Sequence, residues 1–200
     1  MKYLAVVFAC LLLWGCEDKK IDSDAFSSGN AVSKEVEEAN QNLDKKSYAG
    51  LEDIFSDNSL IQTQGKYLLL VFGKNGCGYC EKLKADLKAS EKTRDFLKKS
   101  FTSYYVNISY DKMHRIALKN DKEHMEVDVS TSMLSRNIYR VYVTPTIIFG
   151  DTDGRTIIEF PGYIPQEGFY KILEFITSGE WKKGKDARER MQLLERALGA

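Results

Sequence analysis

Two closely spaced cysteines follow a short apolar run in the stretch Tyr67-Leu-Leu-Leu-Val-Phe-Gly-Lys-Asn-Gly-Cys-Gly-Tyr-Cys80. A continuous apolar run such as residues 67–72 is typical of a β-strand that is buried on both faces of a sheet. A glycine-containing turn interrupts the run, and Cys80, Leu83 and Leu87 then recur at the spacing of one helix face. The stretch therefore predicts a buried strand, a turn, and a helix that begins at the cysteines.

The start of a helix is a place where a cysteine becomes reactive. Unpartnered backbone N–H groups and the helix dipole favour negative charge there, and they lower the pKa of a thiol below its ordinary value of about 8.5. We therefore expect Cys77 to be the nucleophile that attacks disulfides. Cys80, one helical turn later, is expected to face inward and to resolve the mixed disulfide. Lys74 and Glu81 flank the pair as charged residues that can modulate it.

Three other uses of a cysteine pair remain open. A zinc site needs about four ligands, and His114 and His124, which we expect at the surface, lack common zinc-finger spacing. Covalent haem attachment needs a histidine after the second cysteine, where this chain has Glu81. The third use is a purely structural disulfide, although so short a loop constrains little chain entropy. We expect no metal, and no cofactor other than a redox-active disulfide between Cys77 and Cys80.

The rest of the chain continues as strands and helices. Residues 101–108 predict a second strand, and Asp151-Thr-Asp-Gly154 predicts a hairpin between strands at 146–149 and 156–160. Residues 110–128 fit a short helix plus an edge strand, which we interpret as a surface insertion. This order predicts a mixed sheet covered by helices. Apolar residues at helical spacing predict helices at residues 32–43, 48–55, 130–139, 166–177 and 185–198.

Charge and length narrow the class of protein. The chain has 29 basic and 29 acidic residues, so its formal net charge is zero. Without a basic excess to neutralise phosphates, we expect no binding to nucleic acid. Two hundred residues are enough for one sizeable core with extensions. The expected parts are a signal peptide at 1–15, a lipidated cysteine and flexible tether at 16–30, a helical extension at 31–65, a core domain at 66–179 and an amphipathic helix at 180–200.

The N-terminal residues are typical of an export signal. Lys2 precedes an apolar run at residues 3–14, which is shorter than the roughly twenty residues of a membrane-spanning helix and suits a secretory signal. Leu13-Trp-Gly-Cys16 resembles the lipobox of bacterial lipoproteins, which implies a lipid on Cys16. Removal of the signal would leave Cys77 and Cys80 as the thiols of the domain, in an envelope compartment that permits disulfides.

A second motif, Tyr139-Arg-Val-Tyr-Val-Thr-Pro-Thr146, resembles the segment that leads into the cis-proline loop of thioredoxin-fold proteins. With the cysteine pair, it implies an α/β thioredoxin fold with a mixed central sheet flanked by helices, plus extra N-terminal and C-terminal helices. The resemblance implies that Pro145 is cis and, with Thr144, contacts the substrate opposite the cysteines. It also places Gly78 and Tyr79, between the cysteines, among the substrate-binding residues.

Within this superfamily the chain resembles SoxW-type envelope lipoproteins through Gly76-Cys-Gly-Tyr-Cys80, Thr144-Pro-Thr146 and Pro161-Gly-Tyr163. That resemblance implies a monomeric dithiol reductase, anchored by lipid in the periplasm of a Gram-negative bacterium. Its targets would be disulfides of apocytochromes c or sulfur-oxidation carriers, and its electron donor a membrane protein of the DsbD type. The Cys-Gly-Tyr-Cys motif also resembles DsbC-type isomerases, which keeps disulfide isomerisation open. A non-catalytic module that binds a partner through residues 191–198 is a third alternative.

The chain departs from the thioredoxin pattern at two positions near the cysteines. Typical thioredoxins have a tryptophan just before the first cysteine and a buried aspartate on the preceding strand. This chain has Gly76 and Val71 at those positions. A buried proton acceptor for the resolving thiol is therefore absent from that strand, and we expect Glu81 or water to serve instead.

Overall fold

The computed structural model describes residues 33–119 and 124–199, which fall within one compact unit. The predicted signal peptide at 1–15, the lipidation site Cys16 and the tether at 16–30 lie outside the described residues. Within the described ranges, no helix has the length and apolar character needed to cross a membrane.

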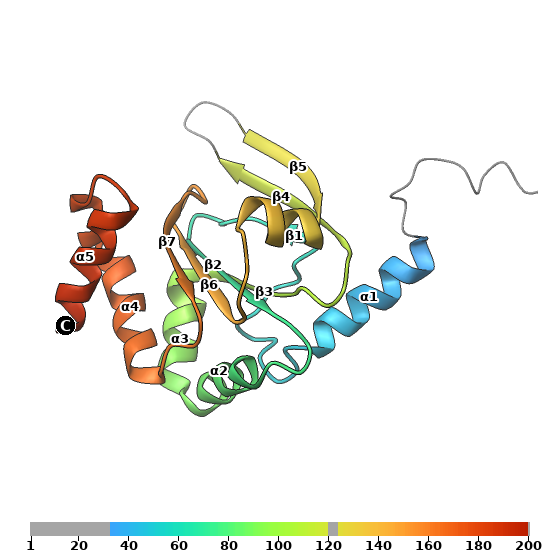
Figure 1. Ribbon diagram of the computed structural model, residues 1–200, viewed down its shortest axis with the longest axis horizontal. Helices are drawn as coiled ribbons and strands as arrows, with labels where there is room; N and C mark the ends of the chain where they lie inside the picture. The colour runs from blue at the N-terminus through green and yellow to red at the C-terminus, as the bar shows by residue number, and fades with distance from the viewer. Residues whose placement is uncertain (1–32, 120–123, 200) are drawn as a thin grey trace, which may run out of the picture. The chain divides into compact units, whose positions relative to one another are not determined.

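A four-stranded mixed sheet forms the centre of the molecule (Figure 1). The strand that the apolar run predicts, β2, is parallel to β3 and antiparallel to β6, and β6 is antiparallel to β7. Every residue of β2 after Tyr67 is buried, because both faces of the sheet are covered. The expected mixed sheet is thus confirmed. The bounds are β2 Tyr67–Gly73, β3 Phe101–Asn107, β6 Thr146–Gly150 and β7 Thr156–Pro161, in the order β3-β2-β6-β7.

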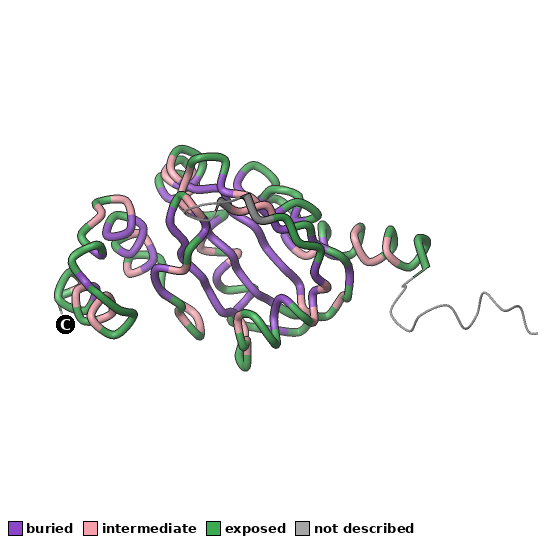
Figure 2. The backbone as a smooth tube through the Cα atoms, turned by 90° about the horizontal axis from the view of Figure 1, so that it is seen from above, coloured by how far each residue is buried: buried purple, intermediate pink, exposed green. Residues whose placement is uncertain are grey.

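Alternate residues of β2 supply two hydrophobic clusters, one on each face of this sheet. Leu69 and Val71 join the cluster formed with the helices α2, α3, α4 and α5. Leu68, Leu70 and Phe72 join the cluster on the opposite face. Figure 2 shows the buried central strands between these two covering layers. The helices on the first face are α2 Gly78–Ala89, α3 Glu91–Ser100, α4 Gln166–Ser178 and α5 Ala187–Leu198.

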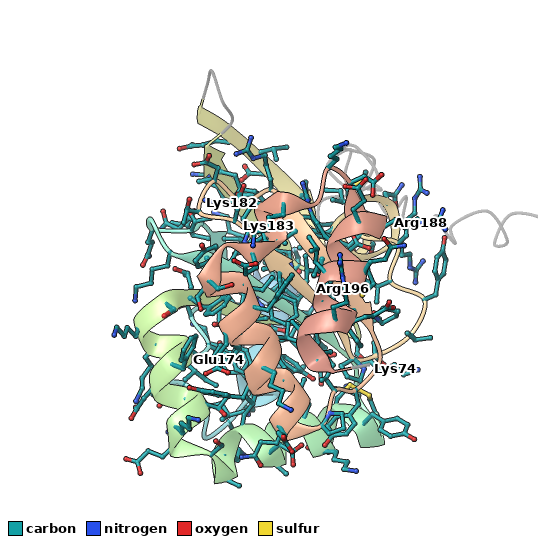
Figure 3. The ribbon with its side chains drawn as sticks, turned by 90° about the vertical axis from the view of Figure 1, so that its left-hand side faces the viewer. Lys74, Glu174, Lys182, Lys183, Arg188 and Arg196 are labelled. Carbon is teal, nitrogen blue, oxygen red and sulfur yellow. A yellow bond between two sulfur atoms is a disulfide. The ribbon has the colours of Figure 1, made fainter. Side chains whose placement is uncertain are left out.

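The C-terminal stretch packs on the domain. Leu194 of α5 is fully buried, and Met191 and Leu198 pack against the same cluster as α4. The 3-10 helix Glu180–Lys183 joins the two helices, and its Trp181 donates an indole hydrogen bond to the Ile176 carbonyl at 3.0 Å. The basic side chains labelled in Figure 3, Lys182, Lys183, Arg188 and Arg196, belong to this C-terminal segment.

A second sheet has three strands in the order β1-β4-β5, and its Ile61, Ile116 and Val129 belong to the same hydrophobic cluster as Leu70 of β2. The short helix expected within residues 110–128 was wrong, because β4 and β5 form an antiparallel hairpin there; the expected edge strand is present as β5. Along β4, His114 and Ile116 are buried while Met113 and Arg115 are exposed, which is the period of a half-buried strand. The bounds are β1 Leu60–Ile61, β4 Met113–Lys119 and β5 His124–Ser130.

The segment at residues 48–55 was wrongly predicted to be a helix. It is a series of turns that ends in a single parallel bridge between Phe55 and Ser103. Its four apolar side chains are buried in the first hydrophobic cluster, so their spacing reflects packing on the core. The predicted helix at 130–139 is present as helical turns, with π-type hydrogen bonding from Met133 to Ile138.

The predicted N-terminal helix is confirmed as α1, Lys34–Lys46, but its apolar stripe does not face the domain. Val36 and Leu43 are 49% and 41% exposed, whereas Asp44 is buried. Asn40 on the same inner side donates a hydrogen bond to the Asp111 carbonyl at 2.7 Å. Polar contacts therefore attach α1 to the domain.

Candidate active site

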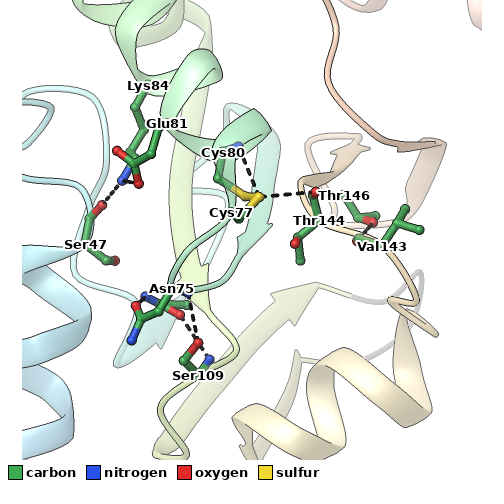
Figure 4. The surroundings of a disulfide bond; sticks show 11 residues. Ser47, Asn75, Cys77, Cys80, Glu81, Lys84, Ser109, Val143, Thr144 and Thr146 are labelled. Atoms are coloured by element: carbon green, nitrogen blue, oxygen red, sulfur yellow. Dashed lines mark hydrogen bonds and ion pairs between the residues drawn. A yellow bond between two sulfur atoms is a disulfide. The ribbon is translucent and has the colours of Figure 1, made fainter.

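Cys77 and Cys80 form a disulfide at the start of α2 (Figure 4). Cys77 is the N-cap residue, and its Sγ accepts a hydrogen bond from the Cys80 backbone N–H at 3.1 Å. The Cys77 side chain is 7% exposed and that of Cys80 is inaccessible. An incoming thiolate or disulfide therefore reaches Cys77 first, and the N–H groups of the helix start face its sulfur.

The segment that carries Thr144 and Pro145 lies across from this sulfur. The Thr144–Pro145 peptide bond is cis, and the Cys77 Sγ lies 3.3 Å from the Thr144 carbonyl oxygen. The loop is held on both sides, because Gly162 N–H donates to the Pro145 carbonyl at 2.7 Å and Thr146 Oγ1 donates to the Val143 carbonyl at 2.8 Å. Thr144 is partly exposed, so part of this residue remains accessible beside Cys77.

Gly78 and Tyr79, between the cysteines, are exposed. The Tyr79 side chain is 64% exposed, and its ring stacks on Tyr163 with centroids 6.0 Å apart. Tyr163 in turn donates its hydroxyl hydrogen to the Asp86 carboxylate. That hydrogen bond raises the pKa of Tyr163 from its ordinary value of 10.0 to about 12.

Sequence reasoning did not include Tyr163 and Asp86 in the site, although they hold the Tyr79 ring in place. The sequence places Tyr163 in a motif before α4, but Asp86 lies 77 positions earlier on α2. No local sequence pattern predicts a contact between two residues so far apart, because the contact depends on how α2 packs beside the loop after β7.

Next to the strand position where typical thioredoxins have a buried acid, the sheet carries a phenol. Val71 is inaccessible and is the register partner of Tyr105 on β3. Burial raises the pKa of Tyr105, and the negative charges of Glu81 and Asp44 add to that effect, so its hydroxyl stays neutral. A Cβ on Gly73 would lie 1.9 Å from this hydroxyl oxygen, which explains the glycine at the end of β2.

Two charged residues sit on α2 immediately after the cysteines. Glu81 is 67% exposed and forms an ion pair of 2.7 Å with Lys84, whose side chain is only 12% exposed. Lys84 Nζ also donates to the Ser47 carbonyl at 2.6 Å and lies over the Tyr105 ring. Lys84 was missed in the sequence-based site, although its position four residues after Cys80 places both on one helix face. Lys74, by contrast, is exposed in the loop before Cys77.

His114 does not lie at the surface, so that expectation was wrong. Its side chain is inaccessible, and its ring nitrogens lie 2.7 Å from the Asn58 carbonyl oxygen and 2.8 Å from Thr131 Oγ1. Burial lowers the pKa of His114, which favours the neutral imidazole. The side chain of His124 lies outside the described part of the structure. Among the described residues, no group of three or more His, Cys, Asp or Glu side chains is arranged to hold a metal ion.

Comparisons with known proteins agree with this geometry. The sequence pattern of a family described as a thioredoxin-like domain matches residues 55–177, which include both cysteines and the Thr144–Pro145 bond. A solved thioredoxin-fold protein from Helicobacter pylori is 47% identical in sequence, with a TM-score of 0.74. That alignment covers 78% of this chain and 96% of the other. Among curated proteins, no sequence matches this chain.

Two more distant solved structures are also similar. A thioredoxin from Thermus thermophilus is 18% identical, with a TM-score of 0.42, over 57% of this chain and 76% of its own. A thioredoxin-like protein from Clostridium perfringens is 17% identical, with a TM-score of 0.38, over 59% of this chain and 80% of its own.

Proposed function

Because this chain belongs to the thioredoxin-like domain family, we propose that it is a thiol–disulfide oxidoreductase that reduces disulfides of proteins in the bacterial cell envelope. The observation that carries this proposal is the asymmetric environment of the cysteine pair. The Cys77 Sγ faces the Thr144 carbonyl at 3.3 Å, while Cys80 is inaccessible behind it. The Cys77 sulfur is thereby placed to bond with a target, and the Cys80 sulfur is placed to release that target from Cys77.

The proposed reaction moves two electrons from the reduced cysteine pair to a target disulfide. The Cys77 thiolate attacks one target sulfur, forming a mixed disulfide and releasing the other target sulfur as a thiolate that takes a proton from solvent. Cys80 then loses its proton and attacks the Cys77 Sγ. The mixed disulfide breaks, the target leaves with both sulfurs reduced, and the Cys77–Cys80 disulfide of the structure is restored.

We propose Glu81 or water as the acceptor of the Cys80 proton, because Val71 occupies the strand position where a buried acid would stand. The exposure of Glu81 and its pairing with Lys84 support a path that ends in solvent. The cysteine pair itself is the redox group in this proposal, with no metal or further cofactor.

The proposed setting is the periplasm of a Gram-negative bacterium, with a lipid on Cys16 as the membrane anchor. The apolar N-terminal run and the lipobox resemblance support this setting. An oxidising compartment requires a source of electrons to regenerate the dithiol, for which we propose a membrane donor of the DsbD type. Apocytochromes c and sulfur-oxidation carriers are the proposed targets of a monomeric reductase, on the strength of the SoxW-type resemblance.

A disulfide isomerase of the DsbC kind is the second candidate, favoured by the Cys-Gly-Tyr-Cys motif and by the threonine before Pro145. Isomerases of that kind dimerise through a separate N-terminal domain. In the described residues, the part before β1 is the helix α1 and a series of turns. A monomer in light scattering that reduces insulin but does not rescue scrambled ribonuclease supports the reductase. A dimer that rescues ribonuclease supports the isomerase.

The decisive experiment is trapping of targets on Cys77. A Cys80→Ser variant cannot resolve the mixed disulfide, so it is expected to accumulate envelope proteins bound to Cys77. The matched Cys77→Ser variant is expected to trap none. Traps on Cys77→Ser but not on Cys80→Ser would reverse the two roles.

The third candidate is a non-catalytic module that binds a partner. A Cys77–Cys80 disulfide that never exchanges with glutathione would favour this candidate. The large apolar side chains of residues 191–198 offer that alternative little free surface, since Leu194 is inaccessible and Met191 and Leu198 pack against the core.

A further inference from the structure

The loop before Cys77 is tied to the segment that follows β3 (Figure 4). The Asn75 backbone N–H donates to Ser109 Oγ at 3.0 Å, and the Asn75 side-chain amide donates to the Tyr110 hydroxyl at 2.8 Å. Asn75 Oδ1 accepts a hydrogen bond from the side-chain amide of Asn107, also at 2.8 Å. Asn75 is exposed to solvent, yet its side chain uses both its donor and its acceptor within the protein. Such a side chain fixes the loop two residues before the nucleophile.

Asn107 connects this loop to a buried ion pair. It is 2% exposed, and its backbone N–H donates to Asp44 Oδ1 at 2.9 Å. Asp44 Oδ2 accepts a hydrogen bond from the Asn58 amide at 2.7 Å and lies 3.0 Å from Lys112 Nζ, without hydrogen-bond alignment to that ammonium. The side chains of Lys112 and Asp44 are only 3% and 2% exposed. A buried carboxylate that accepts two hydrogen bonds beside a cation has little freedom to move.

The ion pair comes from elements outside the strand and helix that carry the cysteines. Asp44 lies near the end of α1, and Lys112 directly precedes β4. A continuous series of contacts therefore runs from Lys112 to Asp44, on to Asn107, and from its side chain to Asn75. It ends two positions from Cys77.

We propose that Asn75 and Asn107 are positioning residues that hold Cys77 at the helix start, where its thiolate is stabilised. The geometry at Cys77 supports this role, because its Sγ meets the Cys80 N–H at 3.1 Å only while the N-cap conformation is kept. Gly76, between the held asparagine and the cysteine, has a φ of +68° and no neighbouring side chain against it. Glycine itself therefore gives the loop no rigidity. This inference deepens the proposed reductase function and rests on it.

Removal of the Asn75 side chain tests the proposal on the full chain. In the reduced Asn75→Ala protein, ultraviolet thiolate absorbance is followed against pH, and the equilibrium with glutathione is measured. We expect the pKa of Cys77 to rise by about half a unit, which is about threefold in the thiol–thiolate equilibrium. Because the thiolate stabilises the reduced form, the glutathione equilibrium should shift about threefold toward the disulfide.

Asn107→Ala and the double variant test whether the effect passes through Asn75. We expect Asn107→Ala to raise the pKa of Cys77 as Asn75→Ala does, and to add no further rise once Asn75 is alanine. The matched control is Asn42→Ala, at an exposed position on α1. Thermal melting shows whether each variant is folded.

Two results would overturn the proposal. In the first, Asn75→Ala leaves both equilibria where Asn42→Ala leaves them. In the second, Asn107→Ala has its full effect in the Asn75→Ala background, so the two residues act separately. Neither measurement uses a protein target, so a failed trapping experiment leaves this test unaffected.

Discussion

The ring of Tyr79 stacks on that of Tyr163, with centroids 6.0 Å apart and planes inclined by 19°. Tyr79 lies between the two cysteines, and Tyr163 lies in the loop after β7. The Tyr163 hydroxyl donates a hydrogen bond to Asp86 of α2, which fixes the Tyr163 ring on which Tyr79 stacks. Tyr79, an exposed aromatic residue beside Cys77, thereby has a supported orientation.

Loss of the Tyr163 ring should weaken target binding. We expect Tyr163→Ala to raise the KM for insulin reduction by about threefold to tenfold with little change in kcat, since a stacked aromatic pair contributes about 0.5–1.5 kcal/mol. Tyr163→Phe keeps the ring, and its KM should stay close to that of the wild type. Equal KM values for the alanine and phenylalanine variants would contradict this role of the stacking.

Lys84 should contribute to stability more than other lysines of the same helical layer. Its ammonium donates to the Ser47 carbonyl and pairs with Glu81 while 12% exposed. We expect Lys84→Met to lower the free energy of unfolding by about 1–2 kcal/mol in urea titrations, because a partly buried carbonyl loses its donor. Lys99→Met, at an exposed position near the end of α3, is the matched control and should change stability by less than about 0.5 kcal/mol.

His114 should make stability depend on pH. Its pKa in the folded protein is lowered by burial, so the unfolded chain binds a proton more readily. The charges of Lys112, Asp44 and Asp111 also act on it. The contribution of the neutral imidazole is therefore present above the unfolded pKa of about 6.5 and is lost as pH falls through the lowered folded value.

His114→Gln tests this dependence. It should lower stability at pH 7.5, because its hydrogen bonds cannot all be rebuilt, but stability should fall less between pH 7.5 and 5.5 than in the wild type. Urea unfolding at the two pH values measures both effects. If the free energy of unfolding fell equally between pH 7.5 and 5.5 in the wild type and in His114→Gln, then His114 would not be the source of the pH dependence.

Gly73 should tolerate no side chain. Its Cβ would lie 1.9 Å from the Tyr105 hydroxyl oxygen and 2.5 Å from Tyr105 Cζ. We expect Gly73→Ala to destabilise the protein by about 1–3 kcal/mol through overpacking. Adding Tyr105→Phe removes the closest atom and should restore part of that loss in thermal melting. Gly78→Ala, with no atom within 4 Å of its Cβ, is the matched control and should be neutral or stabilising.

The elements around the cysteines could be predicted because their patterns are local. The continuous apolar run of β2 and the turn residues between β6 and β7 each indicate one backbone structure. Residues 48–55 misled the prediction, since their apolar spacing imitates a helix while the side chains pack on the core as turns. The hairpin of β4 and β5 was missed because His114, a polar residue, occupies a buried strand position. Its burial is stabilised by Asn58 and Thr131, 56 and 17 positions away.

The sequence by itself determined the disulfide pair, because two cysteines three positions apart at a helix start are joined by local geometry alone. Only the tertiary structure decided what surrounds them. The Thr144 carbonyl reaches Cys77 from 67 positions away, and the series of contacts from Asp44 through Asn107 to Asn75 crosses three segments of the chain. These contacts depend on the packing of α1, β3 and the loop after β2. No local periodicity records such packing, because hydrogen bonds between distant residues form only after the hydrophobic clusters bring the segments together.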